Sequence, residues 1–79
     1  MVSTYETKLP QIFRYVLGLS GDTDVTEIMQ IREVRWDSLA TVTLVAALES
    51  EFHLRLDSRD IERLTSYQST LLLLMEKQQ

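Results

Sequence analysis

Apolar and polar residues follow one another along most of this 79-residue chain with the period of amphipathic helices. In segment 4–19 the apolar positions are spaced i, i+3, i+4, i+7 and i+8, which places them on one face of a helix. Because proline fits best in the first turn of a helix, Pro10 predicts that the regular helix begins near Leu9, and Gly18 or Gly21 would end it. The apolar face consists of Leu9, Ile12, Phe13, Val16 and Leu17.

Segment 38–52 has the strongest helical pattern in the chain. Asp37 or Ser38 can accept a hydrogen bond from the free amides of its first turn. His53 would end the helix, since histidine is among the non-glycine residues that tolerate a left-handed backbone. One side of the helix is lined by Val42, Val45, Leu48 and Phe52, and is broadened by Leu39, Leu44, Ala46 and Ala47.

Two shorter helices are predicted after residue 56. Asp57 and Ser58 offer a cap for the sequence DIERL, a helix of one or two turns that buries Ile61 and Leu64. A last helix is expected to be capped by Thr65 and Ser66, to carry Tyr67, Leu71 and Leu74 on one face, and to have Lys77 near its carboxyl end.

The periodicity weakens over residues 20–37, which predicts a long loop. One short helical turn is expected around residues 26–30, and apolar side chains are expected to hold the loop against the helices: Ile28, Ile31, Val34 and Trp36. The chain is therefore predicted to be a single domain over residues 1–79, an all-α, small four-helix bundle. It has three main helices, a short third helix and a long loop between helices 1 and 2.

Composition narrows the functional classes. The chain has no cysteine, which excludes disulfides and thiolate zinc sites, and its net charge of −4 makes it a poor ligand for nucleic acid. That charge suits partners with positive surfaces. The amino terminus lacks a signal pattern, and the longest apolar run, LLLLM at 71–75, is far shorter than the roughly 20 residues of a membrane span. A cytoplasmic monomer without a membrane span is expected.

Independent catalysis is not expected of this chain. Its only histidine, His53, follows Ser38 by 15 positions on one predicted helix, which separates the two by roughly 22 Å. A serine–histidine pair is therefore excluded while the helix is intact. A lone histidine without cysteine also argues against a transition-metal site.

Residues 22–33 match a calcium-binding loop in part, but this match does not predict a metal site either. Asp22, Asp24, Thr26 and Glu33 stand at loop positions one, three, five and twelve, but the sixth position, which needs glycine, is Glu27. These side chains are expected to be solvated loop residues, and no metal site is predicted.

Ser38 is the remaining candidate for a chemical role, and it lies at the point where a polar loop becomes a helix. It can be a simple helix cap together with Asp37. It can also be a site of covalent modification, because the free amides and the dipole at a helix amino terminus stabilise an attached phosphate. The residues considered one by one leave both interpretations open.

The order of residues from Trp36 to Gln68 resembles the acyl carrier protein family. Asp37-Ser38-Leu39 opens a helix that continues with the pattern L-x-x-x-L-E-x-E-F, and the small third and last helices follow at matching distances. The residues that carry this resemblance are Leu44, Val45, Leu48, Glu49, Glu51, Phe52, Leu56, Asp57, Ile61, Leu64, Thr65, Ser66 and Gln68.

The resemblance implies that Ser38 carries a covalent 4′-phosphopantetheine arm, attached by a phosphopantetheinyl transferase for which Asp37 and Leu39 are flanking recognition residues. The thiol of the arm holds acyl groups as thioesters, so the chain itself is no enzyme. It would be loaded by an acyl-activating ligase or an acyltransferase, and would deliver its cargo to condensing or modifying enzymes of fatty acid, lipid or polyketide-like biosynthesis.

The resemblance also implies further site residues. Leu44, Glu49 and Glu51 match partner-binding positions, although core packing or solvated charge would explain them as well. The candidates for an acyl pocket between the second and third helices are Val42, Ala46, Ile61 and Leu64, for which plain core packing is the alternative.

Some positions depart from the family pattern. Ala40, Thr43 and Ser50 stand where acidic residues are common in carriers of fatty acid synthesis, which indicates partners that recognise shape and apolar contact more than charge. Trp36 is similar to the residue found in stand-alone carriers of specialised pathways. No glycine pair precedes Ser38, which favours an acyl load over a peptidyl or aminoacyl load. A small helical adaptor without any arm is the alternative from another functional class.

Overall fold

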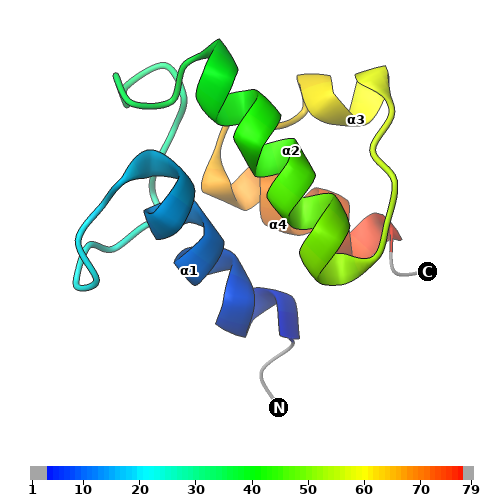
Figure 1. Cartoon of the computed structure of the whole chain (residues 1–79), viewed down its shortest axis with the longest axis horizontal. Coiled ribbons are helices and arrows are strands. Elements are labelled where there is room, and N and C mark those ends of the chain that lie inside the picture. Colours follow the sequence, from blue (N-terminus) through cyan, green and yellow to red (C-terminus); the bar gives the residue numbers. More distant parts are fainter. Residues whose placement is uncertain (1–3, 78–79) are drawn as a thin grey trace.

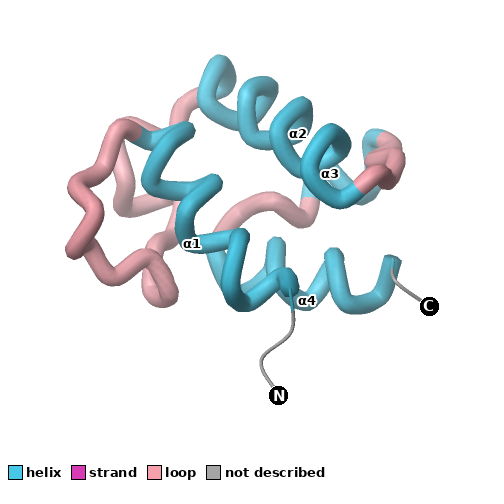
Figure 2. The backbone as a smooth tube through the Cα atoms, turned by 60° about the horizontal axis from the view of Figure 1, so that its bottom comes forward, coloured by secondary structure: helices cyan, strands magenta, loops and turns pink. Residues whose placement is uncertain are grey.

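Four helices account for most of the described chain, which comprises residues 4–77 of the computed structural model. They are α1 (Thr4–Leu17), α2 (Ser38–Phe52), α3 (Ser58–Glu62) and α4 (Tyr67–Lys77). α1 packs against both α2 and α4, and a long loop at one end of the molecule joins α1 to α2 (Figures 1 and 2). The predicted all-α bundle with a short third helix is confirmed.

α1 begins earlier than the position of Pro10 predicted. The helix starts at Thr4 and contains Pro10 in its interior, so the expected start near Leu9 is wrong. Two contacts hold the turns around the proline: the ring of Tyr5 meets that of Phe52 edge-on at 4.8 Å, and Lys8 pairs with Glu51 at 2.6 Å. These tertiary contacts offset the hydrogen bond that a proline removes from a helix interior.

α1 ends at a glycine in the left-handed conformation. Gly18 has a left-handed backbone with φ of 67°, and the amide of Leu19 donates to the carbonyl of Arg14 at 2.8 Å. A left-handed residue just past a helix, which glycine adopts without a steric penalty, satisfies the last free carbonyls. Of the two glycines considered, Gly18 is therefore the one that ends the helix.

Phe13 lies at the centre of the core. It is fully buried, and its ring meets Trp36 at 5.2 Å and Tyr67 at 5.3 Å, both edge-on. Burial raises the pKa of the Tyr67 hydroxyl. Aromatic pairs in this geometry add to the stabilisation from buried area. The trio joins α1, the end of the long loop and α4, and the rest of the core is aliphatic: Leu9, Leu17, Val25, Ala40, Leu44, Leu48, Leu56, Leu64, Leu73 and Leu74.

The long loop is attached to the start of α4 through its backbone. The amide of Gln30 donates to the carbonyl of Thr65 at 2.8 Å, and the amide of Tyr67 donates to the carbonyl of Ile28 at 2.9 Å. One turn does form at the start of the stretch expected to be helical, closed by the amide of Ile28, which donates to the carbonyl of Val25 at 3.1 Å. It does not continue as a helix, because the next backbone groups pair across the molecule and an isolated bridge joins Met29 to Ser66.

The loop does not bury all of its apolar residues. Val25 and Trp36 are buried and Ile28 is half-buried. Ile31 and Val34 are 87% and 91% exposed, so the prediction that they hold the loop against the helices is wrong. The bridge at Met29 and the burial of Trp36 fix the ends of this stretch, and the turns between them point both side chains to solvent.

α3 is short and depends on its caps. Asp57 accepts a hydrogen bond from the amide of Asp60 at 2.9 Å, and Asp60 accepts one from the amide of Asp57 at 3.1 Å, which forms a capping box. Asp60 also pairs with Lys77 of α4 at 2.6 Å. The hydrogen bonds from Lys77 and from the Asp57 amide hold the pKa of Asp60 below its usual range. Lys77 thus binds a side chain of α3 in addition to lying near the negative end of α4.

Candidate functional site

Ser38 is the first residue of α2 and is exposed. Its hydroxyl makes no hydrogen bond to another residue within 4–77, and the backbone N–H groups of Ser38 and Leu39 have no acceptor there. A nucleophilic oxygen therefore lies beside two free hydrogen-bond donors at the positive end of a helix. This combination suits a serine that accepts a phosphate group.

Asp37, and not Ser38, caps α2. Its carboxylate accepts a hydrogen bond from the amide of Ala40 at 2.8 Å, and its backbone is extended. Its carbonyl accepts from the amide of Thr41 at 3.0 Å, which begins the helical hydrogen-bond pattern. Since Asp37 satisfies the third amide of the helix, the Ser38 side chain has no structural role in the cap.

Trp36 fixes the backbone that precedes the serine. Its side chain is 3% exposed, and the indole N–H donates to the hydroxyl of Thr41 at 3.1 Å. The same hydroxyl donates to the carbonyl of Asp37 at 3.2 Å. These bonds connect the last loop residues to the first turn of α2, so that the Ser38 backbone is held from both sides. The sequence identified Trp36 but not Thr41, whose position three residues after the serine was the available signal.

The acyl-pocket candidates divide into two groups. Val42 and Ile61 line a wholly apolar hollow of about 190 Å³ between α2 and α3, together with Thr41 and Val45. Ala46 is exposed and lies outside the lining of this hollow, and Leu64 is 1% exposed within the core. Thr41, Val42 and Val45 are three, four and seven positions after Ser38, so they lie on its face of the helix.

The expected partner-binding residues are already engaged within the chain. Leu44 is 2% exposed, so the expectation that it contacts partners is not met in this structure, because its side chain is part of the core. Glu49 accepts a hydrogen bond from the amide of Leu56 at 2.9 Å. Glu51 pairs with Lys8 at 2.6 Å, at the edge of a second hollow of about 220 Å³ between α1 and α2.

The loop carboxylates make local hydrogen bonds. Asp22 accepts from the hydroxyl of Ser20 at 2.7 Å, and Asp24 accepts from the amide of Thr26 at 3.0 Å. These bonds lower the pKa of each carboxyl. No group of three or more histidine, cysteine or acidic side chains within residues 4–77 is arranged to hold a metal ion.

His53 lies at the far end of α2 from Ser38, as the helical spacing predicted. Its backbone is left-handed, with φ of 54° and ψ of 50°, and its amide donates to the carbonyl of Glu49. The prediction that it caps the helix is confirmed. His53 is therefore too far from Ser38 to act as its base.

The four-helix domain with an unengaged serine at the start of its second helix has the arrangement expected of a small carrier domain. The family model of the phosphopantetheine attachment site matches residues 7–74. An acyl carrier protein of Buchnera aphidicola subsp. Baizongia pistaciae (strain Bp) is 34% identical over 64 residues, which cover 81% of this chain and 82% of that protein. The chain belongs to the acyl carrier protein family, whose members are non-catalytic and carry 4′-phosphopantetheine.

No solved structure matches the chain. None of the helices within residues 4–77 is both long enough and apolar enough to cross a membrane.

Proposed function

We propose that Ser38 is the attachment point of 4′-phosphopantetheine and that the chain delivers acyl groups, held on this arm as thioesters, to partner enzymes. The observation that carries the proposal is the free hydroxyl of Ser38 at the first position of α2, within the stretch matched by the phosphopantetheine attachment family. Asp37 takes over the cap, so modification of the serine costs the fold no hydrogen bond.

The residues around Ser38 fit a phosphodiester. The free amides of Ser38 and Leu39 can donate to phosphate oxygens, and the dipole of a 15-residue helix favours negative charge at this end. No acidic residue occurs in the first turn of α2 itself. The arm supplies the reactive thiol, which explains how a chain without cysteine can take part in thioester chemistry.

The contribution of the protein is presentation. The bonds from Trp36 and Asp37 hold the backbone beside Ser38, while the side chain itself remains exposed. A tethered acyl group reaches each partner's active site at a high effective concentration, without new chemistry in the carrier. The partners of this proposal are a phosphopantetheinyl transferase, an acyl-activating ligase or acyltransferase, and condensing or modifying enzymes.

The cargo we propose is an acyl group of fatty acid, lipid or polyketide-like biosynthesis. The hollow lined by Val42, Val45 and Ile61 is apolar and lies on the serine's side of α2, which suits a hydrocarbon better than a charged aminoacyl group. Its volume of about 190 Å³ is small, so it would shelter only the part of a cargo nearest the thioester. A cytoplasmic location and a monomeric state stay predictions.

Intact-mass measurement tests the attachment directly. The chain is incubated with coenzyme A and a broad-specificity phosphopantetheinyl transferase, with Ser38→Ala and Ser58→Ala as paired variants. Ser58 is the matched control, because it is also exposed and also opens a helix after a capping aspartate. The parent and Ser58→Ala should gain the mass of one arm, and Ser38→Ala should gain none. An unchanged parent mass with several transferases would favour the adaptor without an arm.

A further inference from the structure

The peptide group between Asp37 and Ser38 is held by two hydrogen bonds on its carbonyl side. The carbonyl of Asp37 accepts from the amide of Thr41 at 3.0 Å and from the hydroxyl of the same threonine at 3.2 Å. The first bond is the ordinary opening bond of a helix, whereas the second is additional. Because helix ends fray, the second bond restrains a peptide group that one bond alone would leave more mobile.

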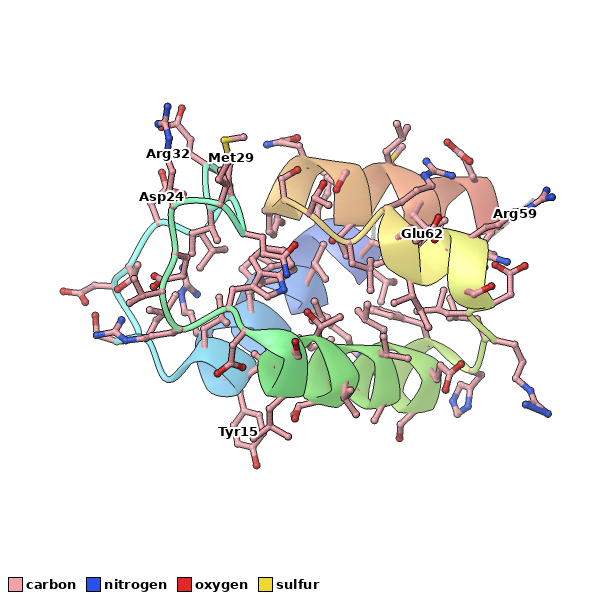
Figure 3. The ribbon with its side chains drawn as sticks, turned by 90° about the horizontal axis from the view of Figure 1, so that it is seen from above. Tyr15, Asp24, Met29, Arg32, Arg59 and Glu62 are labelled. Atoms are coloured by element: carbon pink, nitrogen blue, oxygen red, sulfur yellow. The ribbon has the colours of Figure 1, made fainter. Side chains whose placement is uncertain are left out.

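The hydroxyl of Thr41 is in turn connected to the core. It accepts from the indole N–H of Trp36 at 3.1 Å, and the buried ring of Trp36 meets that of Phe13 edge-on at 5.2 Å. Before Trp36, the loop crosses the end of the molecule from the α4 side, where Met29 and Arg32 lie, to the start of α2 (Figure 3). Trp36 therefore fixes the end of this crossing and joins the core to the first turn of α2.

A restrained carbonyl also orients the N–H group on the other side of its peptide. Peptide groups are planar and trans, so the N–H of Ser38 points opposite to the carbonyl of Asp37. That carbonyl accepts from Thr41, one turn further along the helix, so the N–H of Ser38 points out of the amino-terminal end of α2. This N–H has no acceptor within residues 4–77. Ser38 therefore carries an oriented, unused donor next to its own free hydroxyl.

We propose that Thr41 and Trp36 are positioning residues, which orient the N–H of Ser38 toward a phosphate group carried by the oxygen of the same serine. The proposal rests on the proposed function, because it takes this phosphate to be that of the arm. Donors that are fixed in advance stabilise a charged group without a cost of reorganisation. Fixed donors matter here because the carboxylate of Asp37 remains charged and repels a neighbouring phosphate.

The amide of Leu39 is an internal reference for this proposal. It is also free within residues 4–77, but it belongs to the peptide of the Ser38 carbonyl, to which no side chain in that range donates. Thr41 and Trp36 should therefore affect the N–H of Ser38 and not that of Leu39. A general loosening of the start of α2 would affect both.

Three substitutions isolate the bonds. Thr41→Val removes the hydroxyl and keeps the size of a side chain that lines the apolar hollow. Trp36→Phe removes the indole N–H and keeps an aromatic ring. Thr43→Val is the matched control: its hydroxyl also donates to a carbonyl of the first turn, that of Leu39 at 3.0 Å. The N–H of that peptide group already donates to the carboxylate of Asp37, so it is not available to a phosphate.

Amide hydrogen exchange in the ¹⁵N-labelled full chain measures the effect. Each variant is prepared unmodified, with genetically encoded phosphoserine at position 38, and with the arm attached by a transferase. In the parent, either phosphate group should slow exchange of the amides of Ser38 and Leu39 by at least about tenfold. Thr41→Val and Trp36→Phe should lose at least about threefold of this protection at Ser38 and none at Leu39. Thr43→Val should match the parent at both amides.

The outcomes are distinct. Equal protection of the Ser38 amide in the parent and in Thr41→Val, or an equal loss at Ser38 and Leu39, would overturn the positioning role. If the expected differences occur with phosphoserine but the parent gains no mass with transferases, the positioning role stands and the proposed function fails. If the parent gains the arm but the Ser38 amide is protected equally in all variants, the proposed function stands and the positioning role fails.

Discussion

Asp37→Ala is the substitution that separates the folding role of the site from its chemical role. It removes the carboxylate that accepts from the amide of Ala40 at 2.8 Å. Ala40 is 8% exposed, so water replaces the lost acceptor poorly. Loss of an aspartate cap costs about 1 kcal/mol of the free energy of unfolding. For a chain of this size, that lowers the melting temperature by about 4–8 °C.

Two companion variants give this prediction its controls. Asp37→Asn keeps a cap of similar strength and removes the charge, so it should melt close to the parent. Asp57→Ala removes the equivalent cap from α3, where the carboxylate accepts from the amide of Asp60 at 2.9 Å. It should cost about the same stability. Melting is followed by circular dichroism, and attachment of the arm by intact mass over time with limiting transferase.

The melting temperature and the rate of modification should not change together in these variants. We expect Asp37→Asn to melt like the parent but to be modified more slowly, because the proposed function makes Asp37 a recognition residue for the transferase and the substitution removes its charge. Asp57→Ala should be less stable and modified at the parental rate. If Asp37→Asn is modified at the parental rate, Asp37 caps the helix but is not recognised by the transferase. A melting temperature of Asp37→Ala within about 1 °C of the parent would refute the cap energetics.

Two more predictions concern the helix ends. His53→Gly should raise the free energy of unfolding by about 0.5–1 kcal/mol in urea titrations, since φ is 54° there. Gly18→Ala should lower the free energy of unfolding by about 1 kcal/mol through backbone strain alone, because φ is 67° and nothing lies within 4 Å of an added Cβ. Changes of the same sign in the two variants would contradict the left-handed caps. The pKa of Asp60 is lowered in the folded chain, mainly by Lys77, so its stabilisation is present above the unfolded pKa and lost as pH falls through the folded one. Asp60→Asn should therefore be less stable than the parent at pH about 7 and should approach it on acidification, whereas a pH-independent difference would show that the ion pair does not contribute.

The ends of α2 were predictable because single residues determine them. Asp37 supplies an acceptor at the distance that a cap requires, and His53 tolerates the left-handed backbone that closes the helix. Ser38 was identified as the candidate for modification for a related reason. Because Asp37 can cap the helix, Ser38 is not needed as a cap, and the order of residues after Ser38 resembles a known family.

The start of α1 and the exposure of the loop residues were not predictable from local patterns. Pro10 argues for a late start in isolation, and the contact of Tyr5 with Phe52 that overcomes it joins residues far apart in the chain. Ile31 and Val34 are exposed because the hydrogen bond from Gln30 to Thr65, far along the sequence, sets the course of the loop. In α2 the apolar residues surround the helix, so periodicity alone could not show that Leu44 faces the core while Leu39 faces solvent.

This ambiguity in α2 is consistent with the proposed function. Leu44 and Leu48 on one side of the helix are buried in the core, and Leu39 and Val42 on the opposite side, next to Ser38, face solvent, where the proposed function requires other proteins to act. If recognition depends on apolar contact, both sides need apolar residues, and the sequence signal that separates core from surface is lost. The polar groups that remain have specific duties: Asp37 caps the helix, and Thr41 bonds to the indole of Trp36. The side chains of Ser38 and Arg35 are exceptions, because neither has a hydrogen-bond or ion-pair partner within residues 4–77.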